Sequence, residues 1–318
     1  MRKPSSNTIL RVATLAVAAL TVFALVMFVR AAVVNARSRA KFKDLSQMVD
    51  RPPAAVPEAT QPVLAAAPVE KTAAPTEVPA SRETAAPTEA APVPEDTAAP
   101  AETAAPEATP QPTPPPVTPT PVPGASPTPL PEYAALYERN HDFFGWISVE
   151  GTNVDLPVMY APDRPLQYLG HDFDGKFSYA GVPYVEPECD PKGRYLLVYG
   201  HHMRDGTVFA GLLNYEDPAF WAEHPTFRFD TRFEHRTYAV VVAFRARVLL
   251  QKEKGFRYYN YFALDDENTF REFMTGIRAM AAYDTGVETS LGDEILTLST
   301  CAYHVDNGRF VVVAKRVE

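Results

Sequence analysis

The chain has 318 residues, a formal net charge of −9 at pH 7 and two cysteines. The acidic balance argues against a nucleic-acid-binding protein, whose binding face is basic, and two cysteines cannot form a zinc framework. Most of the 32 prolines fall between Arg51 and Pro131, in a segment with too little apolar surface to form a core. We therefore expect one globular domain over residues 132–318, which is long enough to bury a sizeable core.

A long apolar run lies near the N-terminus. Residues from Val12 to Val29 carry no charge, and Arg11 and Arg30 border them. About 18 apolar residues are close to the minimum for a membrane-spanning helix, and the apolar region of a cleaved signal peptide is shorter. We predict an uncleaved signal anchor that crosses the membrane over about residues 9–29, within an anchor and juxtamembrane segment of residues 1–50. A cleaved signal peptide is the alternative.

The charges beside this run and the segment after it point to opposite orientations. More basic residues follow the apolar run than precede it, and this count places the C-terminal part of the chain in the cytoplasm by the positive-inside rule. Residues 51–131, in contrast, are typical of an exported protein.

The segment of residues 51–131 is of low complexity. The tetrapeptide Thr-Ala-Ala-Pro recurs in it at Thr72, Thr84, Thr97 and Thr103. Such a composition predicts a disordered or polyproline-like linker, which could extend to on the order of 250 Å. It is either a stalk that lets a tethered domain reach into a cell wall or an inert spacer.

The rest of the chain alternates short β-branched runs with turn signals and a few helical patterns. The predicted strands cover residues 145–149, 154–158, 194–199, 226–230, 237–247, 295–300 and 309–315, and the predicted helices cover 132–141, 209–215 and 266–282. An apolar stripe in the last helix predicts packing against the core. Together these elements indicate a mostly-β barrel with appended helices.

The most informative stretch is the apolar run that begins at Ile295 and ends at Cys301. Asp306-Asn307-Gly308 gives a turn signal, and Arg309 opens the following strand, so a hairpin brings a thiol and a guanidinium towards the same end of a sheet. A cysteine nucleophile also needs a base. The strand that ends with Tyr199 and Gly200 is followed directly by His201.

These motifs together resemble those of a sortase. The residues are Thr297-Leu-Ser-Thr-Cys301, the arginine shortly after it, and Tyr199-Gly-His201 at a strand end. Tyr283-Asp-Thr-Gly-Val287, before the cysteine strand, is similar to class B specifically. The likeness covers roughly residues 133–318 and implies an eight-stranded β-barrel. Because sortases act outside the membrane, it also implies a single-pass membrane protein with an extracellular catalytic domain.

The resemblance assigns a role to each of three residues. Cys301 is the expected nucleophile, which attacks as its thiolate. His201 is the expected general acid and base, and Arg309 is expected to hold the substrate carbonyl and the oxyanion. The neighbour His202 is expected to point to the other face of the strand, and Arg316 is also expected to face away, since it lies an odd number of positions from Arg309.

Several other residues carry weaker expectations. Ser299, Thr300, Tyr303 and Leu169 are candidate substrate contacts. Cys189 lies in a polar loop and is expected to be a free or incidental thiol, with a disulfide to Cys301 as the alternative. We expect surface or hydrogen-bonding roles for the remaining histidines, which are His141, His171, His224, His235 and His304. No metal or organic cofactor is expected.

The resemblance implies a cysteine transpeptidase. Its substrates would be exported proteins with a C-terminal sorting motif, which is cleaved after threonine through a thioester on Cys301. An amine of a cell-wall precursor or a pilin lysine would then accept the acyl group. A thiol protease that only hydrolyses is one alternative, because water competes with amines for a thioester. The other alternative is a non-enzymatic, stalked surface-binding module.

Overall fold

The computed structural model describes residues 6–49 and 128–318, and for residues 6–16 and 31 it describes the backbone only. The predicted linker therefore lies almost wholly outside the described residues. The strands are β1 (Phe143–Ser148), β2 (Asp155–Met159), β3 (Tyr184–Val185), β4 (Tyr195–Gly200), β5 (Thr226–Thr231), β6 (Thr237–Arg247), β7 (Ile295–Cys301) and β8 (Gly308–Arg316). The α-helices are α1 (Ser6–Gln47), α2 (Pro131–Arg139), α3 (Pro218–Glu223) and α4 (Glu267–Ala279), and the 3₁₀-helices are η1 (Gln167–Leu169), η2 (Phe209–Glu216) and η3 (Tyr258–Asn260).

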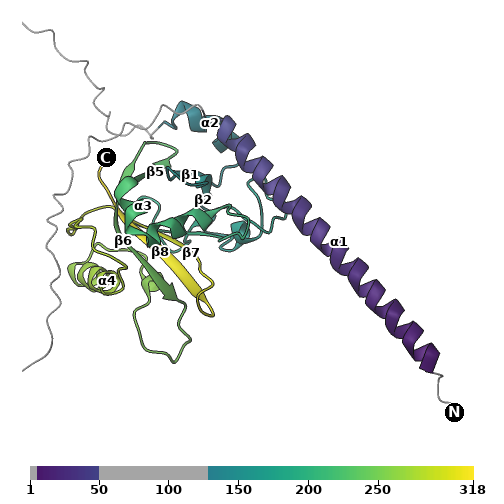
Figure 1. The fold of residues 1–318 in the computed structure, drawn as a ribbon. Helices are drawn as coiled ribbons and strands as arrows, with labels where there is room; N and C mark the ends of the chain where they lie inside the picture. The colour runs from purple at the N-terminus through teal and green to yellow at the C-terminus, as the bar shows by residue number, and fades with distance from the viewer. Residues whose placement is uncertain (1–5, 50–127) are drawn as a thin grey trace, which may run out of the picture. The chain divides into compact units, whose positions relative to one another are not determined.

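The eight strands close into one barrel in the order β1-β2-β3-β4-β7-β8-β6-β5 (Figure 1). The β2–β3 and β4–β7 pairs are parallel, and the other pairs between named strands are antiparallel. The predicted eight-stranded, mostly-β fold is confirmed. Strand β3 was not among the predicted elements, and the helix predicted over residues 209–215 is a 3₁₀-helix over residues 209–216.

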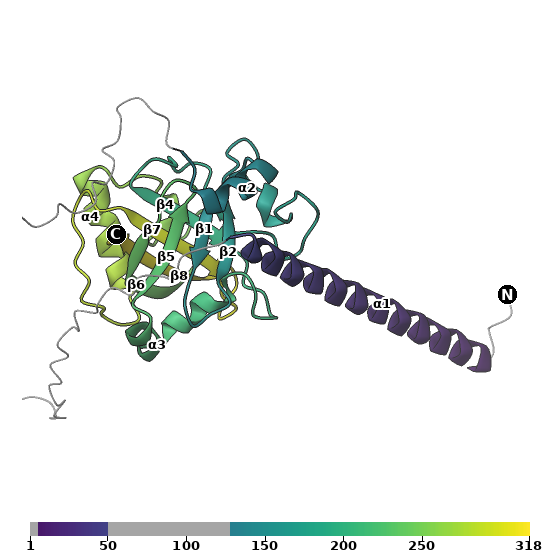
Figure 2. The same ribbon diagram turned by 90° about the horizontal axis from the view of Figure 1, so that it is seen from above.

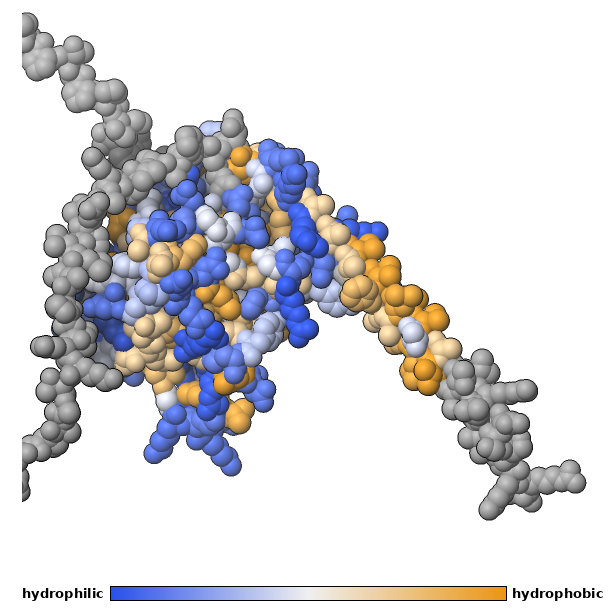
Figure 3. Space-filling model, in the orientation of Figure 1, coloured by the Kyte–Doolittle hydropathy of each residue, from blue (hydrophilic) through white to orange (hydrophobic). Residues whose placement is uncertain are grey.

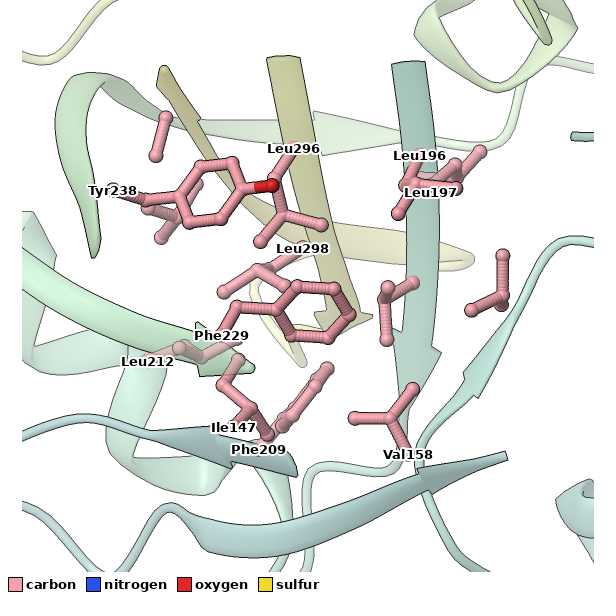
Figure 4. Close-up of a cluster of buried hydrophobic side chains, with 14 of the residues drawn as sticks. Ile147, Val158, Leu196, Leu197, Phe209, Leu212, Phe229, Tyr238, Leu296 and Leu298 are labelled. Atoms are coloured by element: carbon pink, nitrogen blue, oxygen red, sulfur yellow. The ribbon is translucent and has the colours of Figure 1, made fainter. Parts of the chain in front are cut away.

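The barrel interior is filled by apolar side chains from both the strands and the covering segments. Figure 4 shows Leu298 of β7 beside Phe229 of β5, and Phe209 of η2 close to Ile147 of β1. All four side chains are fully buried. Fully burying a large apolar side chain contributes about 1.5–3 kcal/mol, so these contacts fix the strands whose ends carry the candidate site.

Helix α4 packs on the outside of the barrel against β6 (Figure 2). Its buried side chains, Phe270, Phe273, Met274 and Ile277, lie on one face. The Asp266 carboxylate caps the helix by accepting a hydrogen bond from the Thr269 amide at 2.9 Å. The predicted apolar stripe is therefore part of the core.

Helix α1 contains the apolar run near the N-terminus. It is long and apolar enough to cross a membrane, although a signal sequence passes the same test. From Val17 to Val29 the side chains are exposed, and Figure 3 shows apolar residues gathered along this part of the helix. The helix continues without a break into the juxtamembrane residues and ends at Gln47.

Candidate active site

Cys301 is the last residue of β7, a strand that lies between β4 and β8 in the barrel. The six preceding residues of β7 are buried, whereas Cys301 is only partly buried. The apolar run therefore fixes the strand in the core, and its end brings the thiol to the surface. Both neighbouring strands contribute a charged or titratable residue beside it.

His201 reaches Cys301 because β4 and β7 run parallel and end together. Gly200 pairs with Thr300 in the register. The residues that follow them, His201 and Cys301, therefore lie side by side. Gly200 is required here by space, since a Cβ atom at this position would lie 2.5 Å from Cδ2 of Phe209. Phe209 also fixes the backbone of His201, whose carbonyl accepts a hydrogen bond from the Phe209 amide at 2.9 Å.

Hydrogen bonding by the His201 side chain is the largest cause that lowers the pKa of the Cys301 thiol. Burial opposes this effect, while the charges of Arg309 and His201 lower the pKa further. The same hydrogen bond raises the pKa of His201, against the effect of burial. Each shift favours a thiolate beside an imidazolium, which is the form in which a cysteine is nucleophilic.

Arg309 lies directly across the β7–β8 hairpin from Cys301. Directly opposed residues of an antiparallel pair project on the same face of the sheet. The Nη1 of Arg309 donates to the carbonyl of Gly308 at 2.9 Å and to that of Asn307 at 3.4 Å. Among the residues that the structure describes, no carboxylate forms an ion pair with Arg309, so its charge is not neutralised at the site.

The chain has relatives among the sortases. Sortase B of Listeria monocytogenes is 28% identical over 193 residues, which cover 58% of this chain and 74% of that protein. Sortase B of Staphylococcus aureus is 28% identical over 194 residues, which cover 59% of this chain and 75% of that protein. The solved structure of a Staphylococcus aureus sortase B-substrate complex matches with a TM-score of 0.52 and 26% identity, over 59% of this chain and 85% of that one. No protein-family model matches the chain.

The chain is a homologue of class B sortases. The resemblance seen in its motifs is thereby confirmed, and sortases are cysteine transpeptidases. Arg316, the alternative arginine in this sortase homologue, is held by two carboxylates. It contacts Glu294 at 3.1 Å and Glu234 at 3.0 Å. Arg309 therefore remains the arginine that is available beside the thiol.

The four candidate substrate contacts of this sortase homologue divide into two groups. Ser299 and Thr300 are each 1% exposed, and the Ser299 hydroxyl is hydrogen-bonded to that of Tyr258 at 2.7 Å. Both side chains are buried in this structure, on opposite faces of β7. Tyr303 and Leu169 are 66% and 41% exposed. Substrate contact stays a prediction for all four residues.

Leu169 also has a role that its side chain did not reveal. Its backbone carbonyl accepts a hydrogen bond at 2.8 Å from Nε2 of His201. This contact fixes the imidazole ring and places a proton on Nε2, because a carbonyl can only accept. No sequence signal marked it, since the acceptor belongs to the backbone of η1.

The other cysteine and the histidine next to His201 have different surroundings from Cys301 and His201. Cys189 is unpaired and 1% exposed, and burial raises its pKa to about 12. It is therefore a buried thiol, whereas the sequence placed it in a polar loop. Nδ1 of His202 is 3.0 Å from the carbonyl of Cys301 and so contacts its backbone. Within the described ranges, no group of His, Cys, Asp and Glu residues could hold a metal ion.

Proposed function

We propose that this sortase homologue is a membrane-anchored transpeptidase that joins exported proteins to an amine of the cell wall or of a pilin. Residues 132–318 form the catalytic domain, residues 51–131 the linker, and residues 1–50 the anchor. The observation that carries the proposal is the placement of His201 beside Cys301 at the ends of two paired parallel strands, with Arg309 across the hairpin from the thiol. The lowered pKa of Cys301 agrees with this arrangement.

In the first step, the Cys301 thiolate attacks the carbonyl carbon of the threonine in the sorting motif. A C–S bond forms, and the carbonyl oxygen becomes an oxyanion, which Arg309 stabilises. The C–N bond then breaks as the imidazolium of His201 donates a proton to the leaving amine. The products are a thioester on Cys301 and a released C-terminal peptide.

In the second step, an amine of a cell-wall precursor or a pilin lysine attacks the thioester. His201, now neutral, accepts a proton from this amine, a new amide bond forms and the thiolate of Cys301 leaves. The Nε2–H of His201 stays on the Leu169 carbonyl, which leaves the other ring nitrogen for the transferred proton. The chemistry requires no metal or organic cofactor.

The apolar part of α1 supports an anchor in the cell membrane, crossing it once, with the barrel outside the cell. Exported proteins that carry a C-terminal sorting motif are the proposed substrates. Such proteins reach the barrel on the same side of the membrane as the cell-wall amines. This orientation opposes the count of basic residues beside α1, so protease accessibility in intact cells tests it directly.

The test of the proposal is product analysis. The purified full chain in detergent is mixed with a library of threonine-containing sorting peptides, with and without triglycine or a lysine peptide as acceptor. We expect a ligated product that depends on the acceptor and is absent in the Cys301→Ala variant. Cleavage that yields only the free acid in the presence of every acceptor would establish a hydrolytic thiol protease instead.

A further inference from the structure

The juxtamembrane end of α1 carries a stripe of buried residues. Ser38, Phe42, Leu45 and Val49 are 8%, 9%, 0% and 7% exposed, and they recur at intervals of three and four residues. This spacing places Ser38, Phe42 and Leu45 on one face of α1, and Val49 follows two residues after its end. Lys43, on the opposite face, is exposed. A helix whose face is buried in this way is packed against a partner, and β2 and the loops around it are that partner.

Polar contacts fix the position of the helix on the barrel. Oγ of Ser38 is 3.0 Å from Oγ of Ser178, in a buried hydrogen bond. The ammonium group of Lys41 forms an ion pair with Asp174, which also accepts a hydrogen bond from Nε of Arg139 at 2.8 Å. Burial alone would raise the pKa of Asp174, but the hydrogen bonds and the charges of these two cations outweigh it and lower the pKa.

The loop that receives α1 is the one that holds His201. The Ser178 amide donates to the carbonyl of Gly170 at 2.9 Å, and this closes the loop directly behind Leu169, whose carbonyl binds His201. A second contact reaches the loop that follows His201. There, Nε of Arg39 lies 3.5 Å from Oδ2 of Asp205, a buried oxygen that accepts no hydrogen bond within the described part of the chain.

The residues on the two sides of positions 50–127 lie near helix α2, which has Leu130 as its N-cap. Met48 contacts Arg139, at the end of α2, with its sulfur 3.4 Å from Nη1. Asp44 also lies 3.8 Å from the Arg139 guanidinium. The segments on the two sides of residues 50–127 therefore both adjoin this helix.

We propose that residues 34–49 are an intramolecular docking element, which fastens the catalytic barrel to the end of its own anchor helix and braces the loop that positions His201. In the docked state the barrel is held at the end of the anchor helix, so the linker does not increase the distance between the membrane and the domain. A stalk, in contrast, would increase that distance. The statement about reach rests on the proposed membrane anchor, whereas the docking contact itself requires no transpeptidase activity.

Disulfide trapping tests the docking. The full chain with Cys301→Ala and a protease site inserted at Thr97 is prepared in membranes as two cysteine pairs. The test pair is Ser38→Cys with Ser178→Cys, and the matched control is Lys43→Cys with Ser178→Cys. After mild oxidation and cleavage, we expect the two fragments of the test pair to stay joined without reductant and those of the control to separate.

Equal separation of both pairs would overturn the docking, and so would equal cross-linking of both. Two further variants show whether the cross-link depends on the packing of α1 or only on the introduced cysteines. Leu45→Asp, added to the test pair, should abolish its cross-link, whereas Lys43→Asp should leave it intact. Because every chain in this experiment carries Cys301→Ala, failure here is independent of any failure of the proposed transpeptidation.

The bracing of His201 is tested by the pH dependence of Cys301 alkylation in the otherwise unmodified full chain. When Leu45→Asp releases the loop, the hydrogen bond from His201 weakens, and the alkylation midpoint should move to higher pH. Lys43→Asp should retain the midpoint of the unmodified chain. A midpoint that is the same in Leu45→Asp as in Lys43→Asp would overturn the bracing, whatever the docking experiment gives.

Discussion

Arg309→Ala should separate the activation of the thiol from the stabilisation of the oxyanion. The hydrogen bond from His201 is the largest cause of the lowered Cys301 pKa, and the charge of Arg309 contributes less. Thiolate formation should therefore survive the loss of Arg309 better than acyl transfer does. The guanidinium has no carboxylate partner among the described residues, so its removal leaves no unpaired acidic group behind.

The size of the effect follows from the role of an oxyanion donor. Loss of one such donor lowers the rate by about 10²–10³, which corresponds to about 2.7–4 kcal/mol of transition-state stabilisation. We expect kcat/KM for transpeptidation to fall by that factor in Arg309→Ala. Arg309→Lys should recover part of the loss, because it keeps the positive charge but lacks the planar fork of the guanidinium.

The assay compares kcat/KM for a sorting peptide with the rate of Cys301 alkylation by iodoacetamide at the same pH. Arg316→Ala is the matched control, since Arg316 is paired with Glu234 and Glu294 away from the thiol. It should retain both rates. If Arg309→Ala slows alkylation by as much as it slows transpeptidation, Arg309 acts only on the thiol and the oxyanion role is refuted.

Three further outcomes are expected. The alkylation midpoint of Cys301 should lie at lower pH than that of an ordinary cysteine. It should rise in His201→Gln, because this variant removes the main cause of the lowered pKa. An unchanged midpoint would exclude His201 as that cause. Iodoacetamide near neutral pH should label the folded chain once, at Cys301, because burial raises the pKa of Cys189 to about 12. Double labelling seen by intact mass would contradict the burial of Cys189. Leu298→Ala should lower the free energy of unfolding by about 2–5 kcal/mol, measured by chemical denaturation. The control Leu250→Ala, at a side chain that is 64% exposed, should change it by about 0.5 kcal/mol or less. Equal effects of the two variants would show that Leu298 is not in the core.

The sequence predicted the hairpin of the site because turn chemistry and strand patterning are local signals. Asn307 has a φ of 56°, a conformation that asparagine tolerates. Gly308 follows it where a Cβ atom would lie 2.1 Å from the Ala302 carbonyl. These two residues define the turn, and the turn sets Arg309 opposite Cys301. The position of His201 beside them depended instead on the family resemblance, because strand pairing across a hundred residues leaves no local signal.

The features that the sequence did not predict depend on distant or backbone contacts. The Leu169 carbonyl that holds His201 belongs to the backbone, so the residue type carries no information about it. The buried position of Cys189 arises from tertiary packing around a loop that is polar in composition. The stripe from Ser38 to Val49 is visible as a helical period, but nothing in its spacing names the barrel as its partner.

The most direct test of the central claim is the intact mass of the full chain after brief mixing with a cleavable sorting peptide in the absence of an acceptor amine. The expected result is an added mass equal to the acyl portion of the peptide, located on Cys301, removed by hydroxylamine and absent in Cys301→Ala. A chain that cleaves the peptide with no such adduct at any time, or that still cleaves it as Cys301→Ala, would contradict covalent catalysis by Cys301.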